Sequence, residues 1–82
     1  MLYDYQITGN IIRQLRKERG LSQEVLSGLA GISRSHLAMI ENGKKCANVQ
    51  TLWSIADALQ MKLSQLFSVI EQQSNINGGT NP

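Results

Sequence analysis

The side chains best suited to a defined chemistry are polar and basic, and they gather between positions 22 and 45. They are Ser22, Gln23, Ser33, Arg34, Ser35, His36, Asn42, Lys44 and Lys45. Hydroxyl, amide and cationic groups of this kind donate hydrogen bonds to phosphate oxygens, and arginine also binds the O6 and N7 atoms of guanine together. The pattern therefore indicates binding to nucleic acid.

The distribution of charge agrees with this interpretation. The stretch 13–45 has seven basic and three acidic residues, whereas the rest of the chain has one basic and three acidic residues. A basic block on one half of a small domain suits a phosphate backbone. An ordinary solvated face would have the same composition, so charge alone leaves both interpretations open.

Residues for catalysis or metal binding do not form a recognisable set in this sequence. His36 is the single histidine and Cys46 the single cysteine, which leaves no cluster of metal-ligand spacing. The sequence also has no paired carboxylates at a plausible site and no glycine-rich loop that would cradle a phosphate. We expect a protein that is not an enzyme and that uses no metal and no cofactor.

The cysteine count also bears on the cellular compartment. Cys46 has no partner for an internal disulfide, and small secreted domains usually depend on several, which favours a reducing compartment. No apolar run approaches the roughly 18 residues of a membrane span. The N-terminus lacks the pattern of a signal peptide. We therefore expect a cytoplasmic protein with no membrane association.

Apolar residues recur at helical spacing along the chain, and no stretch alternates as a strand does. We expect one compact, repressor-like all-α domain over residues 1–71, with five helices at about 7–19, 23–29, 34–41, 49–59 and 65–71. Their predicted N-caps include Ser22, Ser33, Asn48 and Ser64. The polar residues 72–82 are expected to form a disordered tail. Gly28 is unfavourable inside a helix, and a close approach by a neighbouring helix would explain it.

The second and third of these helices have the spacing of a helix-turn-helix. The segment LSQEVLSGLAGISRSHLAMIENG, residues 21–43, describes two short helices joined by a tight turn at Ala30-Gly31-Ile32. The turn needs small residues because the two helices cross at a steep angle. The residues that then face outward from the second helix are Ser33, Arg34, Ser35 and Met39. A helix presented in this way can enter the major groove and reach base edges.

Over residues 11–67 the sequence resembles the XRE family, the phage-repressor and Cro type of helix-turn-helix regulator. The matching residues are Arg16, Glu18-Arg19-Gly20-Leu21-Ser22-Gln23, Leu26, Ala30-Gly31-Ile32-Ser33, Ile40-Glu41-Asn42-Gly43, Thr51-Leu52, Ile55-Ala56, Ala58-Leu59 and Leu66-Phe67. Because the match covers most of the chain, it is more specific than a single short motif. The sequence departs from the family at Ser27, where alanine is usual, and at Cys46-Ala47, where proline is common.

The resemblance implies roles for individual residues at the DNA interface. Arg34, Ser35 and Met39 are at positions that the family uses for base contacts. Arg34 could instead hold a phosphate, and Met39 could either touch a thymine methyl or merely cover the helix surface. Gln23 would hold a phosphate and brace the recognition helix.

The resemblance also implies two structural roles. Arg16 and Glu41 would form an ion pair that ties the first helix to the end of the recognition helix. Phe67 would belong to the hydrophobic core of the domain.

Further contacts to the DNA backbone are expected around the recognition helix. The hydroxyl of Ser22 can donate to a phosphate or serve only as a cap. Ser33 is likewise expected to contact the DNA backbone. His36 has no companion for catalysis or a metal, so we expect it to contact phosphate or sugar. The residues that follow the recognition helix in a loop along the backbone are Asn42, Lys44 and Lys45. Another basic group, Arg13, Lys17 and Arg19, is expected to form a solvated face.

These interpretations predict a sequence-specific regulator of transcription that binds double-stranded DNA as a homodimer on a palindromic operator. It would be of the phage or mobile-element repressor type or of the restriction–modification controller type. The predicted dimer surface comprises Leu63, Ile70 and Trp53, although Trp53 could equally be part of the core. The alternative is an antitoxin-like interaction module that binds a toxin partner as well as DNA.

Overall fold

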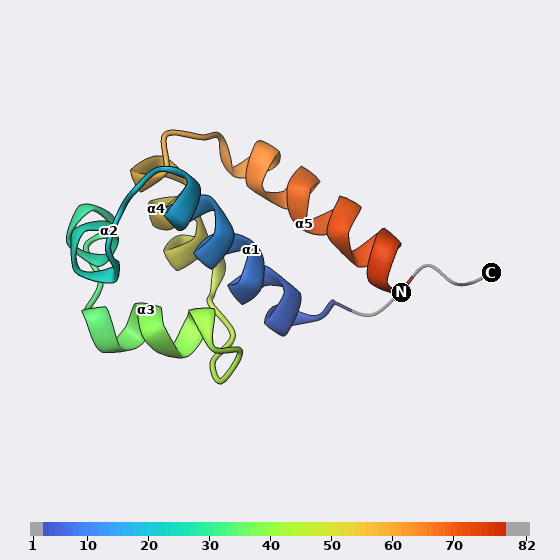
Figure 1. Cartoon of the computed structure of the whole chain (residues 1–82), viewed down its shortest axis with the longest axis horizontal. Helices are drawn as coiled ribbons and strands as arrows, with labels where there is room; N and C mark the ends of the chain where they lie inside the picture. The colour runs from blue at the N-terminus through green and yellow to red at the C-terminus, as the bar shows by residue number, and fades with distance from the viewer. Residues whose placement is uncertain (1–2, 79–82) are drawn as a thin grey trace.

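The computed structural model describes residues 3–78, which form five α-helices and no strand (Figure 1). The helices are α1 (Tyr5–Glu18), α2 (Gln23–Ala30), α3 (Arg34–Glu41), α4 (Val49–Ala58) and α5 (Leu63–Gly78). The predicted all-α fold is confirmed, and α2 and α3 form the predicted helix-turn-helix pair. Within the described residues, none of these helices has the length and apolarity needed to cross a membrane.

Three of the helix boundaries follow directly from capping side chains. Ser22, Ser33 and Asn48 each accept a hydrogen bond from the backbone N–H three residues later, at 3.1, 3.0 and 2.8 Å. Each bond satisfies one of the N–H groups that a helix leaves unpaired at its start. At the other end of α2, Gly31 has the left-handed conformation, with φ of 72°, and so ends the helix before the turn. These caps fix where α2, α3 and α4 begin.

The last helix is longer than the sequence pattern predicts. It begins at Leu63, so Ser64 lies inside the first turn and is not the N-cap. The side chain of Gln65 accepts a hydrogen bond from the Lys62 backbone N–H at 2.8 Å and satisfies that donor instead. Residues 72–78 of the expected tail are helical, because no glycine or proline interrupts residues 72–77 and glutamine is a good helix former. Residues 79–82 of that tail lie outside the described residues.

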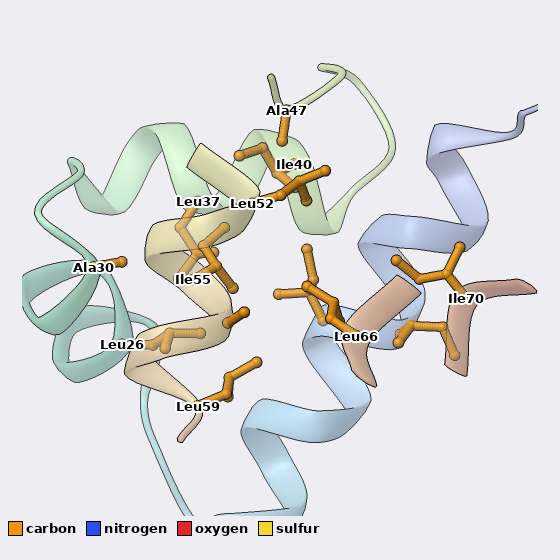
Figure 2. Packing of buried hydrophobic residues seen from close by; sticks show 13 residues of the cluster. Leu26, Ala30, Leu37, Ile40, Ala47, Leu52, Ile55, Leu59, Leu66 and Ile70 are labelled. Atoms are coloured by element: carbon orange, nitrogen blue, oxygen red, sulfur yellow. The ribbon is translucent and has the colours of Figure 1, made fainter. Parts of the chain in front are cut away.

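A single hydrophobic core collects side chains from all five helices (Figure 2). Its buried members are Ile11, Ile12, Leu26, Ala30, Leu37, Ile40, Ala47, Leu52, Ile55, Ala56, Leu59, Leu66 and Ile70. Phe67 packs against this cluster but is only partly buried. The core holds α3 from behind and leaves its other side in solvent.

The placement of Ile70 corrects the predicted dimer surface. Ile70 is 4 % exposed and belongs to the core, so it is not available for a contact between two copies of the chain. The reason is the length of α5, which lies alongside α1 and contacts it (Figure 1). A helix that ended at residue 71 would have left Ile70 in a fraying last turn, whereas it lies in the middle of α5.

Two departures from the family pattern are accommodated locally. Ser27 is 4 % exposed, and its hydroxyl donates to the Glu24 carbonyl oxygen at 3.1 Å, so a buried polar atom is satisfied within α2. Ala47 is buried in the core where a proline is common in the family. Neither change disturbs the helix-turn-helix pair.

The surroundings of Gly28 differ from the close helix approach that the sequence favours. A Cβ atom built on Gly28 has no heavy atom of a neighbouring element within 4 Å, so no helix of this chain approaches it. Gly28 is exposed on the outer side of α2. Nothing in the structure explains why glycine stands here, and its backbone φ does not require it.

Replacing Gly28 by alanine is therefore expected to stabilise the protein. Alanine restricts the unfolded chain and favours the helix, which raises the free energy of unfolding by about 0.5–1 kcal/mol, or roughly 2–8 °C in Tm for a domain of this size. Gly31→Ala is the matched control, because a Cβ there also meets no atom within 4 Å but φ is +72°. That variant should melt below the wild type. A Gly28→Ala protein that also melts below the wild type would contradict the prediction.

Candidate nucleic-acid interface

The face of α3 that points away from the core carries the predicted base-contact residues. Arg34, Ser35 and Met39 are all exposed, and Met39 retains 45 % of its accessible surface. Leu37 and Ile40 face the opposite way into the core. The 3.6-residue period of the helix places 35 and 39 on one outward stripe with Arg34 beside it at the N-terminal end. The structure thus brings the three residues together on one accessible surface.

The predicted phosphate contacts flank this surface. The hydroxyl oxygens of Ser22 and Ser33 accept the capping bonds, which leaves each hydroxyl hydrogen to donate elsewhere. Asn42 ends α3, and Lys44 and Lys45 are exposed in the loop between α3 and α4. These five side chains can donate hydrogen bonds, and each lies near an end of α2 or α3.

His36 is partly buried in the first turn of α3, in contrast to its exposed neighbours Arg34 and Ser35. Its contact with phosphate or sugar remains a prediction.

A buried ion pair joins α1 to the last turn of α3. Arg16 Nε lies 2.8 Å from Glu41 Oε2, and Arg16 Nη2 lies 3.0 Å from Glu41 Oε1. The side chains are 9 % and 0 % exposed. Hydrogen bonding to Glu41 raises the pKa of the Arg16 guanidinium, so its charge is secure. The predicted pair is present in a two-pronged geometry that fixes both side chains.

Gln23 extends this pair to the start of α2. Its Nε2 donates to Glu41 Oε1 at 3.0 Å, and Arg16 Nη1 donates to the Leu21 carbonyl oxygen at 2.8 Å. These bonds draw the N-terminus of α2 to the C-terminal turn of α3. The bracing role implied for Gln23 is therefore visible in the structure, whereas its contact with phosphate remains a prediction.

Comparison with known protein families identifies the same helix-turn-helix. A family model described as Helix-turn-helix matches residues 12–66, which is more than half of the chain. The chain belongs to this helix-turn-helix family. The XRE-type resemblance in the sequence is thereby confirmed, and the matched residues run from the middle of α1 into α5.

The relatives of this helix-turn-helix protein include regulators of two kinds. It is 39 % identical over 66 residues to the control protein C.MunI of Mycoplasma sp, covering 79 % of this chain and 89 % of that protein. It is 36 % identical over 73 residues to the immunity repressor protein of Bacillus phage phi105, covering 84 % of this chain and 51 % of the repressor.

A solved structure is similar over nearly its whole length. The restriction–modification controller protein C.AhdI from Aeromonas hydrophila superposes with a TM-score of 0.75 and 34 % identity, covering 78 % of this chain and 97 % of that chain. The fold of the helix-turn-helix protein is therefore that of a known controller protein.

Arg19 has a structural role in this helix-turn-helix protein that sequence reasoning missed. Arg19 is exposed, as expected, and in addition its Nε donates to the Leu59 carbonyl oxygen at the end of α4 at 2.8 Å. Its Nη1 also donates to the Leu15 carbonyl oxygen at 3.3 Å. The bond to Leu59 joins residues 40 positions apart, and no local pattern could have revealed it. Arg19 thus ties the end of α1 to the turn between α4 and α5.

That turn borders a groove of about 610 Å³ between α4 and α5 of the helix-turn-helix protein. Trp53 and Leu63 are among its lining residues, together with the charged residues Asp57 and Lys62. Trp53 is 56 % exposed, so it is a surface residue rather than a core residue. Two of the three residues predicted for a dimer surface, Trp53 and Leu63, therefore line this groove.

Among the described residues, no group of three or more histidine, cysteine, aspartate or glutamate side chains lies close enough to hold a metal ion.

Proposed function

We propose that this protein is a sequence-specific, double-stranded DNA-binding regulator of transcription that inserts α3 into the major groove. The observation that carries the proposal is the outward face of α3, where Arg34, Ser35 and Met39 are exposed while the core and the Arg16–Glu41 pair hold the helix from behind. A helix presented in this way can reach base edges in the major groove. The family membership and the regulators among the relatives support it. The protein acts in the cytoplasm and performs no catalysis.

The direct test is selection of bound sequences from a random duplex library, followed by fluorescence anisotropy with the selected duplex and a scrambled duplex. We expect a clear preference for the selected sequence. We also expect the affinity to fall steeply with salt, because each neutralised phosphate releases counterions. Equal affinity for the selected and scrambled duplexes would refute the proposal.

Two single substitutions distinguish base reading from backbone binding. Arg34→Ala is expected to cost about 1–3 kcal/mol of binding energy on the preferred operator and to relax the preference at one base position in each half-site. Lys44→Ala should weaken binding to all sequences alike and reduce the salt dependence. Anisotropy titrations on single-base operator variants at several salt concentrations measure both effects. If the two variants lose affinity uniformly over all sequences, Arg34 is a phosphate contact.

The regulator acts as a homodimer on a palindromic operator. One domain offers few base contacts, and two copies related by a two-fold axis would read half-sites about 34 Å apart. The groove between α4 and α5 supports this assembly, because Trp53 and Leu63 expose apolar surface there next to both acidic and basic groups. Asp57 and Lys62 could then pair across the two-fold axis.

The dimer is tested by placing a charge in the groove. Leu63→Glu is expected to shift the protein toward monomer and to weaken operator binding at the same time, because the glutamate would be buried unpaired at the contact. Ser68→Glu is the matched control, since Ser68 is exposed on α5 and does not line the groove. Sedimentation at micromolar concentration is the measurement. A Leu63→Glu protein that dimerises like the wild type would exclude this surface.

Among regulators, the restriction–modification controller type is favoured over the phage repressor type. Two controller proteins are among its relatives, C.MunI at 39 % and C.AhdI at 34 % identity, and the identity to the phage repressor is 36 %. A controller of a restriction–modification system is expected to bind next to a restriction or modification gene. Mapping of the selected operator on the source DNA tests this assignment, and an operator with no such neighbour would reject it.

A further inference from the structure

Glu41 accepts three hydrogen bonds, one of which comes from a residue proposed to contact DNA. The side chain of Glu41 is 0 % exposed. Two of the bonds come from Arg16 and complete the ion pair, at 2.8 and 3.0 Å. The third comes from Gln23 Nε2 at 3.0 Å. The two bonds from Arg16 complete the ion pair between α1 and α3, whereas the third bond links this pair to α2.

The third bond determines which way the Gln23 amide points. A carboxylate only accepts hydrogen bonds, whereas an amide has a donor end and an acceptor end. The amide therefore turns Nε2 toward Glu41, because the opposite orientation would place two acceptor oxygens against each other. One N–H of Gln23 is then used, and the second N–H remains available to another acceptor.

The position of Gln23 at the start of α2 makes this remaining N–H a candidate donor to a phosphate. Gln23 is the first residue of α2 and follows the N-cap Ser22. The start of a helix attracts phosphate through its free backbone N–H groups and its dipole. A glutamine that is already held in one orientation also loses less side-chain freedom on binding than a free one.

We propose that Glu41 is a positioning residue for DNA binding, which orients the Gln23 amide so that its free N–H meets one phosphate oxygen. The inference rests on the proposed function and adds a residue that does not itself touch DNA. Glu41 acts through Gln23, and Arg16 holds Glu41 in place with two N–H groups. The same network fixes the distance between the start of α2 and the end of α3, since Arg16 also binds the Leu21 carbonyl oxygen.

The test uses the selected operator duplex, prepared with a single neutral methylphosphonate at each backbone position in turn. For the wild type, neutralising the phosphate that Gln23 contacts should weaken binding. Gln23→Met should bind the normal duplex about tenfold more weakly, and its affinity should not change further when that phosphate is neutralised. The position at which the two proteins differ in this way marks the Gln23 contact. Glu41→Gln should show the same selective loss at the same phosphate. A glutamine at position 41 can present either end of its amide to Gln23, so the fixed orientation is lost.

Control variants separate positioning from a general loosening of the fold. Ile55→Val trims a fully buried side chain of α4, a helix that contributes no residue to the network, and it should keep the wild-type pattern of sensitive phosphates. The double variant Arg16→Met/Glu41→Leu replaces the pair by apolar groups and leaves Gln23 without its acceptor. This double variant should lose the contact with the same single phosphate, and it serves as the test if Glu41→Gln does not fold.

Three results are decisive. Selective loss at the Gln23 phosphate supports the proposal. An unchanged pattern in the folded Glu41 variant, or a uniform loss at all phosphates, overturns it. Absence of sequence-specific binding by the wild type would instead refute the proposed function, which is a separate outcome.

Discussion

Glu41→Ala is expected to lower the free energy of unfolding by about 3–5 kcal/mol, the largest effect on stability that we predict for a single polar side chain. The substitution leaves the Arg16 guanidinium in a site where its side chain is 9 % exposed, without the two acceptors that it has in the wild type. Gln23 loses its acceptor as well. Since small domains have a total stability of about 5–15 kcal/mol, this loss is a large share of the whole.

The size of the effect depends on leaving one charge unpaired, and a double-mutant cycle measures this. Arg16→Ala should destabilise the protein by a similar amount, and the double variant should lose much less than the sum of the two. Urea unfolding at a fixed protein concentration provides the free energies, because a dimer makes stability depend on concentration. Additive losses within about 0.5 kcal/mol would show that the two residues are not coupled in solution.

The helix-turn-helix itself was predictable from sequence because its boundaries are set by local chemistry. Ser22, Ser33 and Asn48 are caps whose bonds reach only three residues along the chain, and Gly31 adopts the left-handed conformation that ends α2. Such interactions depend on neighbouring residues and not on the rest of the fold. The outward face of α3 follows from the same boundaries and the helical period.

The features that the sequence does not predict occur where distant parts of the chain meet. Arg19 binds a carbonyl 40 positions away, and Ile70 is buried in the core because α5 packs against α1 and α4. The loss of apolar spacing after Ile70 predicts a disordered tail, although glutamine and serine can continue a helix that already packs against the rest of the fold. The sequence also does not predict the surroundings of Gly28, because spacing along the chain does not say which helix lies opposite this residue.

In the candidate site, too, some features follow from the sequence and others only from the structure. Arg16 and Glu41 could be paired in advance only through the resemblance to a family, since 25 positions separate them. The bond between Gln23 and Glu41 adds a third member and links the start of α2 to the end of α3. The sequence therefore predicts which residues face DNA, and the structure adds how their orientations are coupled.

Gly9→Ala is expected to be the most damaging conservative substitution in the chain. A Cβ at position 9 would overlap the carbonyl oxygen of Ile40 and lie 3.2 Å from the carbonyl oxygen of Glu41. Both obstacles are backbone atoms of the last turn of α3, so they cannot move aside as a flexible side chain would. Relief requires α1 to separate from α3, which should cost about 1–3 kcal/mol or more and displace the recognition helix.

The displacement of α3 distinguishes Gly9→Ala from an ordinary loss of stability. Because α1 and α3 are also joined by Arg16 and Glu41, their separation strains the ion pair and shifts the base-contact face relative to the start of α2. We therefore expect weaker operator binding even below the melting temperature, where the variant is fully folded by circular dichroism. Gly28→Ala is the matched control, since the same change of side chain meets open space there and should leave operator affinity unaltered. Wild-type operator affinity and Tm in Gly9→Ala would mean that α1 and α3 do not pack this closely in solution.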